Sequence, residues 1–349
     1  MSTAVILMTH RFDEPILEEF QRIRGGLSGA DRAFVLSDGS APTPDSLIPW
    51  THTFDAAQVC RRASRIIGTD ILRNVHLAWI DFFEAHPGFE AYWLIEYDVL
   101  YSGDWNELFD AFRNHPQDLL CTHLRTFAEE PEWCWWHEIQ APGQVLPQQT
   151  LRRGFLPIAR LSRRGFERLR DAVDEGWSGF LEGLIPTLFQ DSGLSLADIG
   201  GEGTFVPEGF RNRFYTSTSD SAGSLQDLGT MRFAPPLLFP RIKPGRLYHP
   251  VKPGPEVVDA GAFDPGQACL ALDCALKRAQ EKSSPGQHLQ VLTGLTPPEL
   301  GQALDDMEAE GGEALPVQDL RHRLNSLEPQ GFSSLTRFLR RFLLQGTPS

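Results

Sequence analysis

The sequence predicts an α/β protein whose strands form one layered sheet, and three observations indicate this class. Residues 4–8 form a short apolar run, a helical pattern follows from residue 13, and residues 33–36 form a second apolar run. Strand, helix and strand in this order are typical of a sheet with crossover helices. Residues 91–95 add aromatic and branched side chains suited to a fully buried strand. We therefore expect a central sheet flanked by helices.

The first two strands both end in polar residues. Thr9, His10 and Arg11 follow the first strand, and Ser37 and Asp38 follow the second. Open α/β sheets bind ligands at the carboxyl ends of their strands. These residues are therefore candidate ligand contacts, although each taken alone is more often a turn or cap residue.

The helix between these strands has clear limits. Asp13 is placed to cap it, and Pro15 suits its first turn. Ile16 and Phe20 repeat at helical spacing, and the glycines at 25–26 end the pattern.

Two acids separated by one residue follow the buried strand at residues 91–95. If the strand continues through Glu96 and Asp98, both carboxylates point to one face of the sheet. Carboxylates are rarely buried without a partner, so this position suggests a cation, a sugar hydroxyl or the rim of an active site. The alternative is a pair of surface acids in a loop. Asp104 then caps a further helix.

The rest of the chain alternates helices, strands and loops. The residues after 253 differ in composition, with Pro and Gly between short helical patterns, which indicates a helical C-terminal extension. We expect a loop at 40–54, a helix at 69–85, strands at 118–122 and 155–161, a helix capped by Ser162, an irregular stretch at 211–246 and short helices after 254.

Composition narrows the class of protein. The 349 residues allow one large α/β domain with an addition, or two domains, and the net charge of −14 argues against general affinity for nucleic acid. Five scattered cysteines do not form a disulfide framework and fit a reducing compartment. We find neither a secretory signal nor a run of about 18 apolar residues. We expect a cytoplasmic protein without a transmembrane segment.

Residues 121–137 combine Cys, His and Trp. Cys121, His123, Cys134 and His137 offer four zinc ligands, but the spacing of the first pair is atypical and tryptophans crowd the second. A tryptophan-rich loop beside a pocket, or simply part of the core, is favoured over structural zinc. Aromatic rings stack on the apolar faces of sugars, and they pack equally well on Leu and Pro.

Glu182 stands in an apolar stretch at 176–189 that ends in Ile-Pro-Thr-Leu-Phe. A carboxylate in apolar surroundings has a raised pKa, which suits a general base. The alternative, favoured by composition alone, is a solvent-facing Glu on an amphipathic helix. The glycines at 200–203 lack the spacing of a dinucleotide-binding loop, so we expect only a flexible turn.

Two segments near the end of the chain carry further candidates. His249 lies between Tyr248 and Pro250, and Lys252 follows three residues later. A neutral imidazole can complete a metal site begun by Asp98, and a lysine can offset phosphate charge, although a lone His is more often structural. Residues 333–344 form an amphipathic pattern that fits a membrane surface or a partner, or docking on the chain's own domain.

Three pieces in this order resemble glycosyltransferases of the GT-A fold: the acid-x-acid pair after a buried strand, a Glu before Ile-Pro-Thr, and a late Tyr-His-Pro-x-Lys. The likeness is closest to glycosyltransferase-like proteins with a Tyr-Asp-Val-x-x-x-Gly-Asp-Trp segment. It implies a GT-A domain at 1–253, a Rossmann-like mixed sheet flanked by helices, with a helical extension at 254–349. Glu in place of the first Asp of the D-x-D motif departs from the family pattern.

The resemblance also implies roles for residues of this chain. Asp98 and His249 are expected to hold Mn²⁺ or Mg²⁺, Glu182 to act as base, and Trp133, Trp135 and Trp136 to bind the acceptor. Donor contacts are expected from Thr9, His10, Arg11, Asp38, Glu96, Asp98 and Lys252.

The expected function is transfer of a sugar from a nucleotide donor, with UDP-sugar favoured, to a glycan or lipid-linked acceptor, with inversion and on the cytoplasmic side of the membrane. The alternatives are a non-catalytic glycan- or protein-binding module on the same fold, which the Glu at the first acidic position suggests, and a metal-dependent hydrolase or zinc protein.

Overall fold

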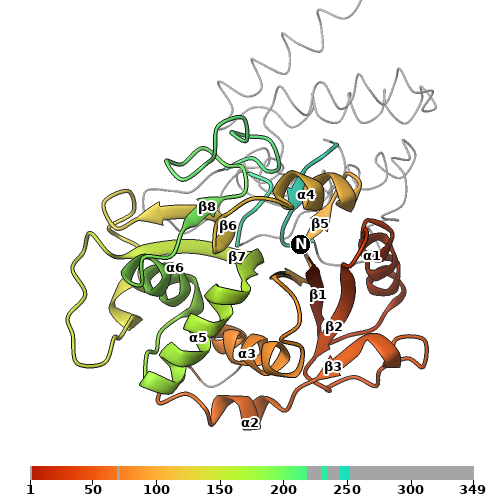
Figure 1. The fold of residues 1–349 in the computed structure, drawn as a ribbon, viewed down its shortest axis with the longest axis horizontal. Coiled ribbons are helices and arrows are strands. Elements are labelled where there is room, and N and C mark those ends of the chain that lie inside the picture. Colours follow the sequence, from red (N-terminus) through yellow and green to blue (C-terminus); the bar gives the residue numbers. More distant parts are fainter. Residues whose placement is uncertain (1, 69–70, 218–228, 234–243, 252–349) are drawn as a thin grey trace, which may run out of the picture. The chain divides into compact units, whose positions relative to one another are not determined.

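A seven-stranded mixed sheet forms the centre of the larger of two compact units (Figure 1). The computed structural model describes residues 2–68, 71–217, 229–233 and 244–251. The first unit contains the described residues up to 99 and from 103 to 217. The second contains 100–102, 229–233 and 244–251. The chain therefore leaves the first unit briefly, immediately after the predicted acid pair.

The sheet has the strand order β3-β2-β1-β4-β7-β6-β8. β1 is parallel to β2 and β4, and β2 is parallel to β3. β7 is antiparallel to β4 and to β6, while β6 and β8 are parallel. The expected class, a mixed α/β sheet flanked by helices, is confirmed. The strands of the first unit are β1 (Thr3–Thr9), β2 (Arg32–Ser37), β3 (Thr51–Thr53), β4 (Ala91–Glu96), β6 (Leu119–Thr126), β7 (Arg152–Ser162) and β8 (Leu196–Asp198).

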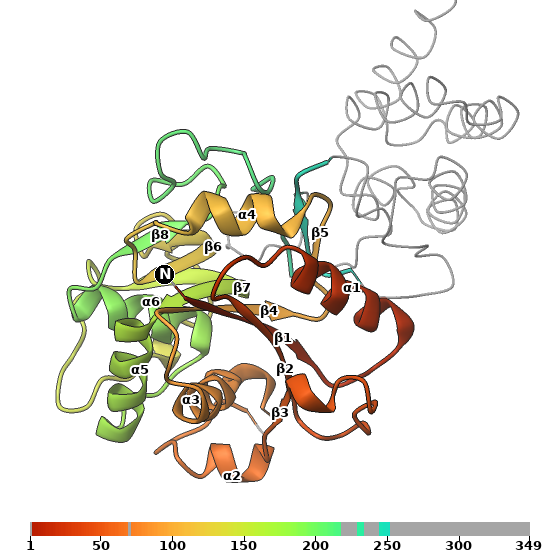
Figure 2. The same cartoon turned by 45° about the vertical axis from the view of Figure 1, so that its right-hand side comes forward.

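Helices cover both faces of the sheet. In Figures 1 and 2, α1 and α4 lie on one face, and α3, α5 and α6 lie on the other. The helices of the described residues are α1 (Glu14–Gly25), α2 (Ala56–Cys60), α3 (His76–Ala85), α4 (Trp105–Phe112), α5 (Arg163–Glu175) and α6 (Leu181–Asp191), with short 3-10 turns η1 (Ile48–Trp50), η2 (Leu72–Asn74) and η3 (Trp136–Glu138). Within the described residues, no helix has the length and apolar character needed to cross a membrane.

Local sequence explains several element limits. The Ser162 hydroxyl accepts from the Gly165 amide and caps α5, as predicted. α1 ends before Gly26, where a Cβ would lie 2.7 Å from the Cβ of Trp105. Only a glycine lets the end of α1 approach the start of α4 this closely. Glu19 of α1 then accepts from the indole nitrogen of Trp105 at 2.8 Å, which fixes the two helices together.

Three sequence expectations need correction. The stretch at 40–54 contains β3, whose short polar sequence at the sheet edge lacks an apolar pattern. The helix expected from residue 69 begins only at His76, because the Asn74 side chain bonds the backbone N–H and C=O of Ile67 at 2.9 Å and holds this segment as a loop. Leu72, in the 3-10 turn before this helix, is 68% exposed. β8 was not expected.

The second unit is described over two short strands. β5 (Leu100–Tyr101) and β9 (Leu247–Tyr248) are antiparallel, with Leu100 opposite Tyr248. The predicted helical extension at 254–349, including 333–344, lies outside the described residues. The predicted domain boundary at 253 therefore stays a prediction.

Candidate functional site

Three neighbouring parallel strands of the first unit end at one edge of the sheet. Thr9, at the end of β1, lies opposite Ser37 of β2, and Met8 lies opposite Glu96 of β4. The polar residues predicted after these strands therefore come to one rim. Such a rim, outside the carboxyl ends of parallel strands, is where open α/β sheets bind ligands.

The acid pair is formed by a turn. β4 ends at Glu96, and the Val99 amide donates to the Glu96 carbonyl at 3.0 Å. The strand therefore does not continue through the two acids, and the expectation that strand alternation aligns their carboxylates is wrong. One carboxylate oxygen of Glu96 nevertheless lies within 4.8 Å of one from Asp98. Asp98 is only 4% exposed, whereas Glu96 is half-buried.

The residues after β1 form a compact polar turn beside the acid pair. The Thr9 hydroxyl donates to the Arg11 carbonyl at 2.7 Å and accepts from the Arg11 amide at 3.1 Å. Arg11 forms an ion pair with Asp13. The exposed His10 ring meets Tyr97 edge-on, with 4.8 Å between centroids. This ring contact ties the end of β1 to the turn that carries the acids.

Asp38 shapes its own loop at the same rim. Its Oδ1 accepts from the Ser40 amide at 3.0 Å and from the Ser40 hydroxyl at 2.6 Å. The same hydroxyl lies 3.3 Å from the His10 carbonyl. Asp38 is half-buried, so its carboxylate faces both the loop and solvent.

Glu182 reaches this edge on the other half of the sheet. It lies in the first turn of α6, which packs on β6, β7 and β8. Because β7 is antiparallel to β4, the first residues of β7 lie at the edge where β4 ends. One of these residues is Arg153, and the Glu182 carboxylate raises its pKa. The expected apolar surroundings of Glu182 thus include a buried guanidinium.

Sequence reasoning missed a buried ionic cluster behind Glu182. Glu130 pairs with Arg153 at 3.0 Å and lies 3.8 Å from Arg125, and Arg125 lies 3.9 Å from Asp198. Burial lowers the pKa of Arg153, and the carboxylates of Glu130 and Glu182 raise it. Buried charges of this kind persist only when they are paired. The ionic cluster consists of Arg125, Glu130, Arg153 and Asp198.

Asp198 is saturated by fixed donors. It accepts from the amides of Leu124, Gly200 and Gly201 and from the Tyr215 hydroxyl, all at 2.8–3.0 Å. A Cβ on Gly201 would lie 2.2 Å from the Tyr215 hydroxyl, and one on Gly203 would lie 2.2 Å from the Arg125 guanidinium. The glycine run at 200–203 was the available signal, since glycines permit such close approach.

The aromatic loop packs mainly on itself. Trp133 and Trp136 are 6% and 8% exposed and meet edge-on, with 4.8 Å between centroids. The half-buried Trp135 lies between the Phe180 ring, at 4.9 Å, and the Arg73 guanidinium, at 5.5 Å. Packing therefore accounts for the burial of Trp133 and Trp136, and an acceptor role for any of the three stays a prediction.

The cysteine and histidine residues of this region lie apart. Cys121 and His123 are buried in β6, while Cys134 is exposed and the His137 side chain is 75% exposed. Burial, followed by Asp198 and Glu182, raises the pKa of the Cys121 thiol well above its usual value, which disfavours the thiolate that zinc needs. Within the described ranges these four residues do not form a metal-binding group.

In the second unit, His249 is fixed by backbone contacts. Its amide donates to the Thr230 carbonyl at 2.8 Å, and its Nδ1 lies 2.7 Å from the Arg232 carbonyl. A carbonyl partner requires a proton on Nδ1, so the lone pair of the neutral ring is on Nε2, the usual arrangement of a metal-binding histidine. Lys252 lies outside the described residues.

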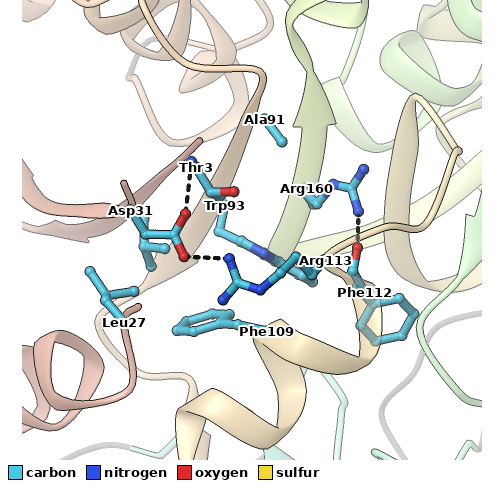
Figure 3. A pocket seen from close by; sticks show the side chains of 10 residues that line it. Thr3, Leu27, Asp31, Ala91, Trp93, Phe109, Phe112, Arg113 and Arg160 are labelled. Carbon is cyan, nitrogen blue, oxygen red and sulfur yellow. Dashed lines mark hydrogen bonds and ion pairs between the residues drawn. The ribbon is translucent and has the colours of Figure 1, made fainter. Parts of the chain in front are cut away.

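A small pocket lies at the opposite edge of the first unit's sheet (Figure 3). Thr3 and Ala91, the first residues of β1 and β4, line it together with Asp31, Arg113 and Arg160. Figure 3 shows Asp31 bonded to Thr3 and Arg113. The free space of about 10 Å³ suits about one water molecule, so this pocket is too small for a nucleotide.

No family model and no curated protein sequence matches the chain. Among solved structures, mouse xyloside xylosyltransferase 1 matches 55% of this chain and 82% of its own, at 11% identity and TM-score 0.31. The mannosyltransferase PcManGT of Pyrobaculum calidifontis was solved with GDP-Man and Mn²⁺. The match covers 98% of this chain and 86% of that protein, at 12% identity and a TM-score of 0.31. The match to residues 1–349 of S. aureus TarS covers 99% of this chain and 92% of that structure, at 11% identity and a TM-score of 0.32. At these scores the likenesses do not bear on the chemistry of this chain.

Proposed function

We propose that this protein is a GT-A type glycosyltransferase that moves a sugar from a nucleotide donor, with UDP-sugar favoured, to a glycan or lipid-linked acceptor. The observation that carries the proposal is the rim at which β1, β2 and β4 end. It presents three carboxylates (Asp38, Glu96 and Asp98), a histidine and an arginine at the ends of three parallel strands of the mixed sheet. This combination suits a diphosphate, its counter-cation and a ribose.

In this proposal, Asp98 and His249 hold a divalent cation, with Glu96 beside it. Two carboxylates with one imidazole suit Mn²⁺ or Mg²⁺ better than a softer metal. When bound, the cation would offset the negative charge that develops on the departing diphosphate.

The donor is held by residues of the same rim. His10 and Arg11 supply the charge and N–H groups that a diphosphate accepts, and Thr9 fixes the backbone turn that presents them. Asp38 accepts from ribose hydroxyls in this proposal, and Lys252 adds positive charge.

Glu182 serves as the general base in an inverting reaction. An acceptor hydroxyl is a poor nucleophile, so a positioned carboxylate must remove its proton as the new bond forms. Glu182 lies in the first turn of α6, which Thr187 fixes along β7 through two hydrogen bonds to the backbone of Arg152. Loss of transfer in folded Glu182→Gln, with donor binding retained, would exclude the alternative of a non-catalytic binding module.

Calorimetric titration of UDP in the presence of Mn²⁺ tests the proposal. Wild type is expected to bind, and Asp98→Ala to lose at least about tenfold in affinity, or about 1.4 kcal/mol. Asp171→Ala, which removes an exposed carboxylate paired only with Arg170, is the matched control and should bind as wild type does. Circular dichroism confirms that both variants fold. If wild type binds no nucleoside diphosphate with any divalent cation, the proposal is wrong.

A further inference from the structure

The ionic cluster contains a buried arginine, Arg153, that pairs with Glu130 and lies against Trp133. Arg153 is 1% exposed, and its Nε lies 3.0 Å from Glu130. Its guanidinium also lies 5.2 Å from the centre of the Trp133 ring. A planar cation held by a carboxylate and an aromatic face has little freedom to move.

The start of α6 is fixed against the same partners. Thr187 exchanges two hydrogen bonds with the backbone of Arg152, at 2.9 and 3.0 Å, which sets the position of α6 along β7. Gly183 directly follows Glu182, and a Cβ at Gly183 would lie 3.0 Å from the Trp133 ring. The backbone beside Glu182 and the guanidinium of Arg153 thus both rest on Trp133.

We infer that Arg153 is a positioning residue for Glu182: fixed by Glu130 and Trp133, its guanidinium holds the Glu182 carboxylate in one orientation at the start of α6. The electrostatic effect of Glu182 on Arg153 agrees with this arrangement. The catalytic consequence depends on the proposed role of Glu182 as base, whereas the positioning itself does not.

Another buried arginine of β7 provides a matched control. Arg160 is 2% exposed and donates only to backbone carbonyls, those of Phe112 at 2.6 Å, His115 at 2.8 Å and Gln117 at 3.4 Å. Burial lowers the pKa of Arg160 to about 10, with Asp118 acting in the opposite direction. Replacing either arginine removes a buried cation from the same strand, but Glu182 affects the pKa of Arg153 and not that of Arg160.

The decisive measurement is a carbon-13 NMR titration of the glutamate carboxyl groups, in which Glu182→Gln identifies the Glu182 signal. We expect Arg153→Met to raise the midpoint of that signal by about one pH unit or more, because an opposite charge nearby favours the carboxylate. Arg160→Met should leave the midpoint unchanged. Glu130→Gln removes the negative charge that pairs with Arg153. The midpoint of the Glu182 signal should then stay the same or fall.

Kinetics supply the second readout. In donor transfer, Arg153→Met should lower kcat at least tenfold with the donor KM unchanged, and Arg160→Met should retain kcat. The inference is overturned if the Glu182 midpoint is unchanged in folded Arg153→Met. It is also overturned if Arg153→Met and Arg160→Met shift the midpoint equally. If wild type transfers no sugar but the midpoint moves as expected, the proposed function fails and the positioning stands. If Arg153→Met does not fold, Arg153→Lys is used, whose point charge cannot reproduce the planar contact.

Discussion

The two halves of the first unit's sheet use carboxylates in different ways. At the rim of β1, β2 and β4, Asp38 bonds only within its own loop, and Glu96 and Asp98 are brought together by a four-residue turn. In the ionic cluster on the other half of the sheet, Asp198 is fully buried and accepts from the backbone of β6, from the backbone of the loop after β8 and from Tyr215.

The difference separates carboxylates that hold the fold from those available for chemistry. A buried carboxylate whose oxygens are all engaged by fixed donors cannot release them to a ligand without leaving those donors unpaired. A carboxylate bonded within its own loop can change partners at small cost. We therefore expect substitutions in the ionic cluster to affect stability, and substitutions at the rim to affect binding.

Asp198→Ala is expected to have the largest effect. It leaves three amides and the Tyr215 hydroxyl without their acceptor, and it leaves Arg125 near one fewer carboxylate. We expect a loss of at least about 3 kcal/mol in the free energy of unfolding. Urea unfolding followed by circular dichroism measures it, with Asp198→Asn as the milder variant. A loss below about 1 kcal/mol would break the distinction between the two halves.

His76 extends the comparison to a buried ionisable group that forms no ion pair with another described residue. Burial lowers its pKa from 6.5 to about 4, and its Nδ1 makes no hydrogen bond. As pH falls from 6.5, the unfolded chain takes up a proton that the folded chain refuses until about pH 4. Wild type should therefore lose up to about 3 kcal/mol across this window, then level off.

His76→Leu should remove this part of the pH dependence while leaving the stability at pH 8 less changed. Unfolding curves of both proteins between pH 4 and 8 provide the measurement. Parallel pH profiles for wild type and variant would show that another group is responsible.

Gly201→Ala tests the packing of the ionic cluster. The added methyl would lie 2.2 Å from the Tyr215 hydroxyl and force it off Asp198. We expect a loss of about 1–3 kcal/mol in the free energy of unfolding. Gly88→Ala is the control, since nothing lies within 4 Å of its Cβ position. It should change stability by less than about 0.5 kcal/mol, and equal losses in both variants would contradict the account.

Asp38→Ala should have the smallest effect on stability. Its two bonds to Ser40 stay within one exposed loop, so the free energy of unfolding should change by less than about 1 kcal/mol. If Asp38 contacts the ribose, UDP affinity should fall about tenfold. Urea unfolding and calorimetry on the same samples decide between a structural and a binding residue. A large loss of stability with normal UDP affinity would show that Asp38 stabilises the fold, as is expected of Asp198.

Much of the rim could be predicted from the sequence because its residues are close in the chain. The strands before Thr9, Asp38 and Glu96 have continuous apolar runs, and polar residues at their ends mark where each strand stops. The rule that ligands bind at the carboxyl ends of parallel strands then locates the site. The turn that joins Glu96 to Asp98 was not predicted, since the apolar pattern on both sides equally suits a continuous strand.

The ionic cluster could not be predicted because nothing local marks it. Arg153 is the second residue of a strand whose apolar pattern starts two residues later, and Asp198 ends a three-residue strand. Their partners come from separate segments, among them Glu130 and Tyr215, which lie far from them in sequence. Periodicity reports only which face of an element is buried. It does not report which charges meet there.

The sequence by itself determined the class of fold, the order of most elements and the acids at the end of β4, because these follow from short-range patterns of apolar and polar residues. Only the tertiary structure decided that Arg153 pairs with Glu130, and that the glycines at 200, 201 and 203 make room for Asp198, Tyr215 and Arg125. The physical reason is desolvation: a charge is stable inside a protein only where distant segments bring it a partner, and that meeting is a property of the folded chain.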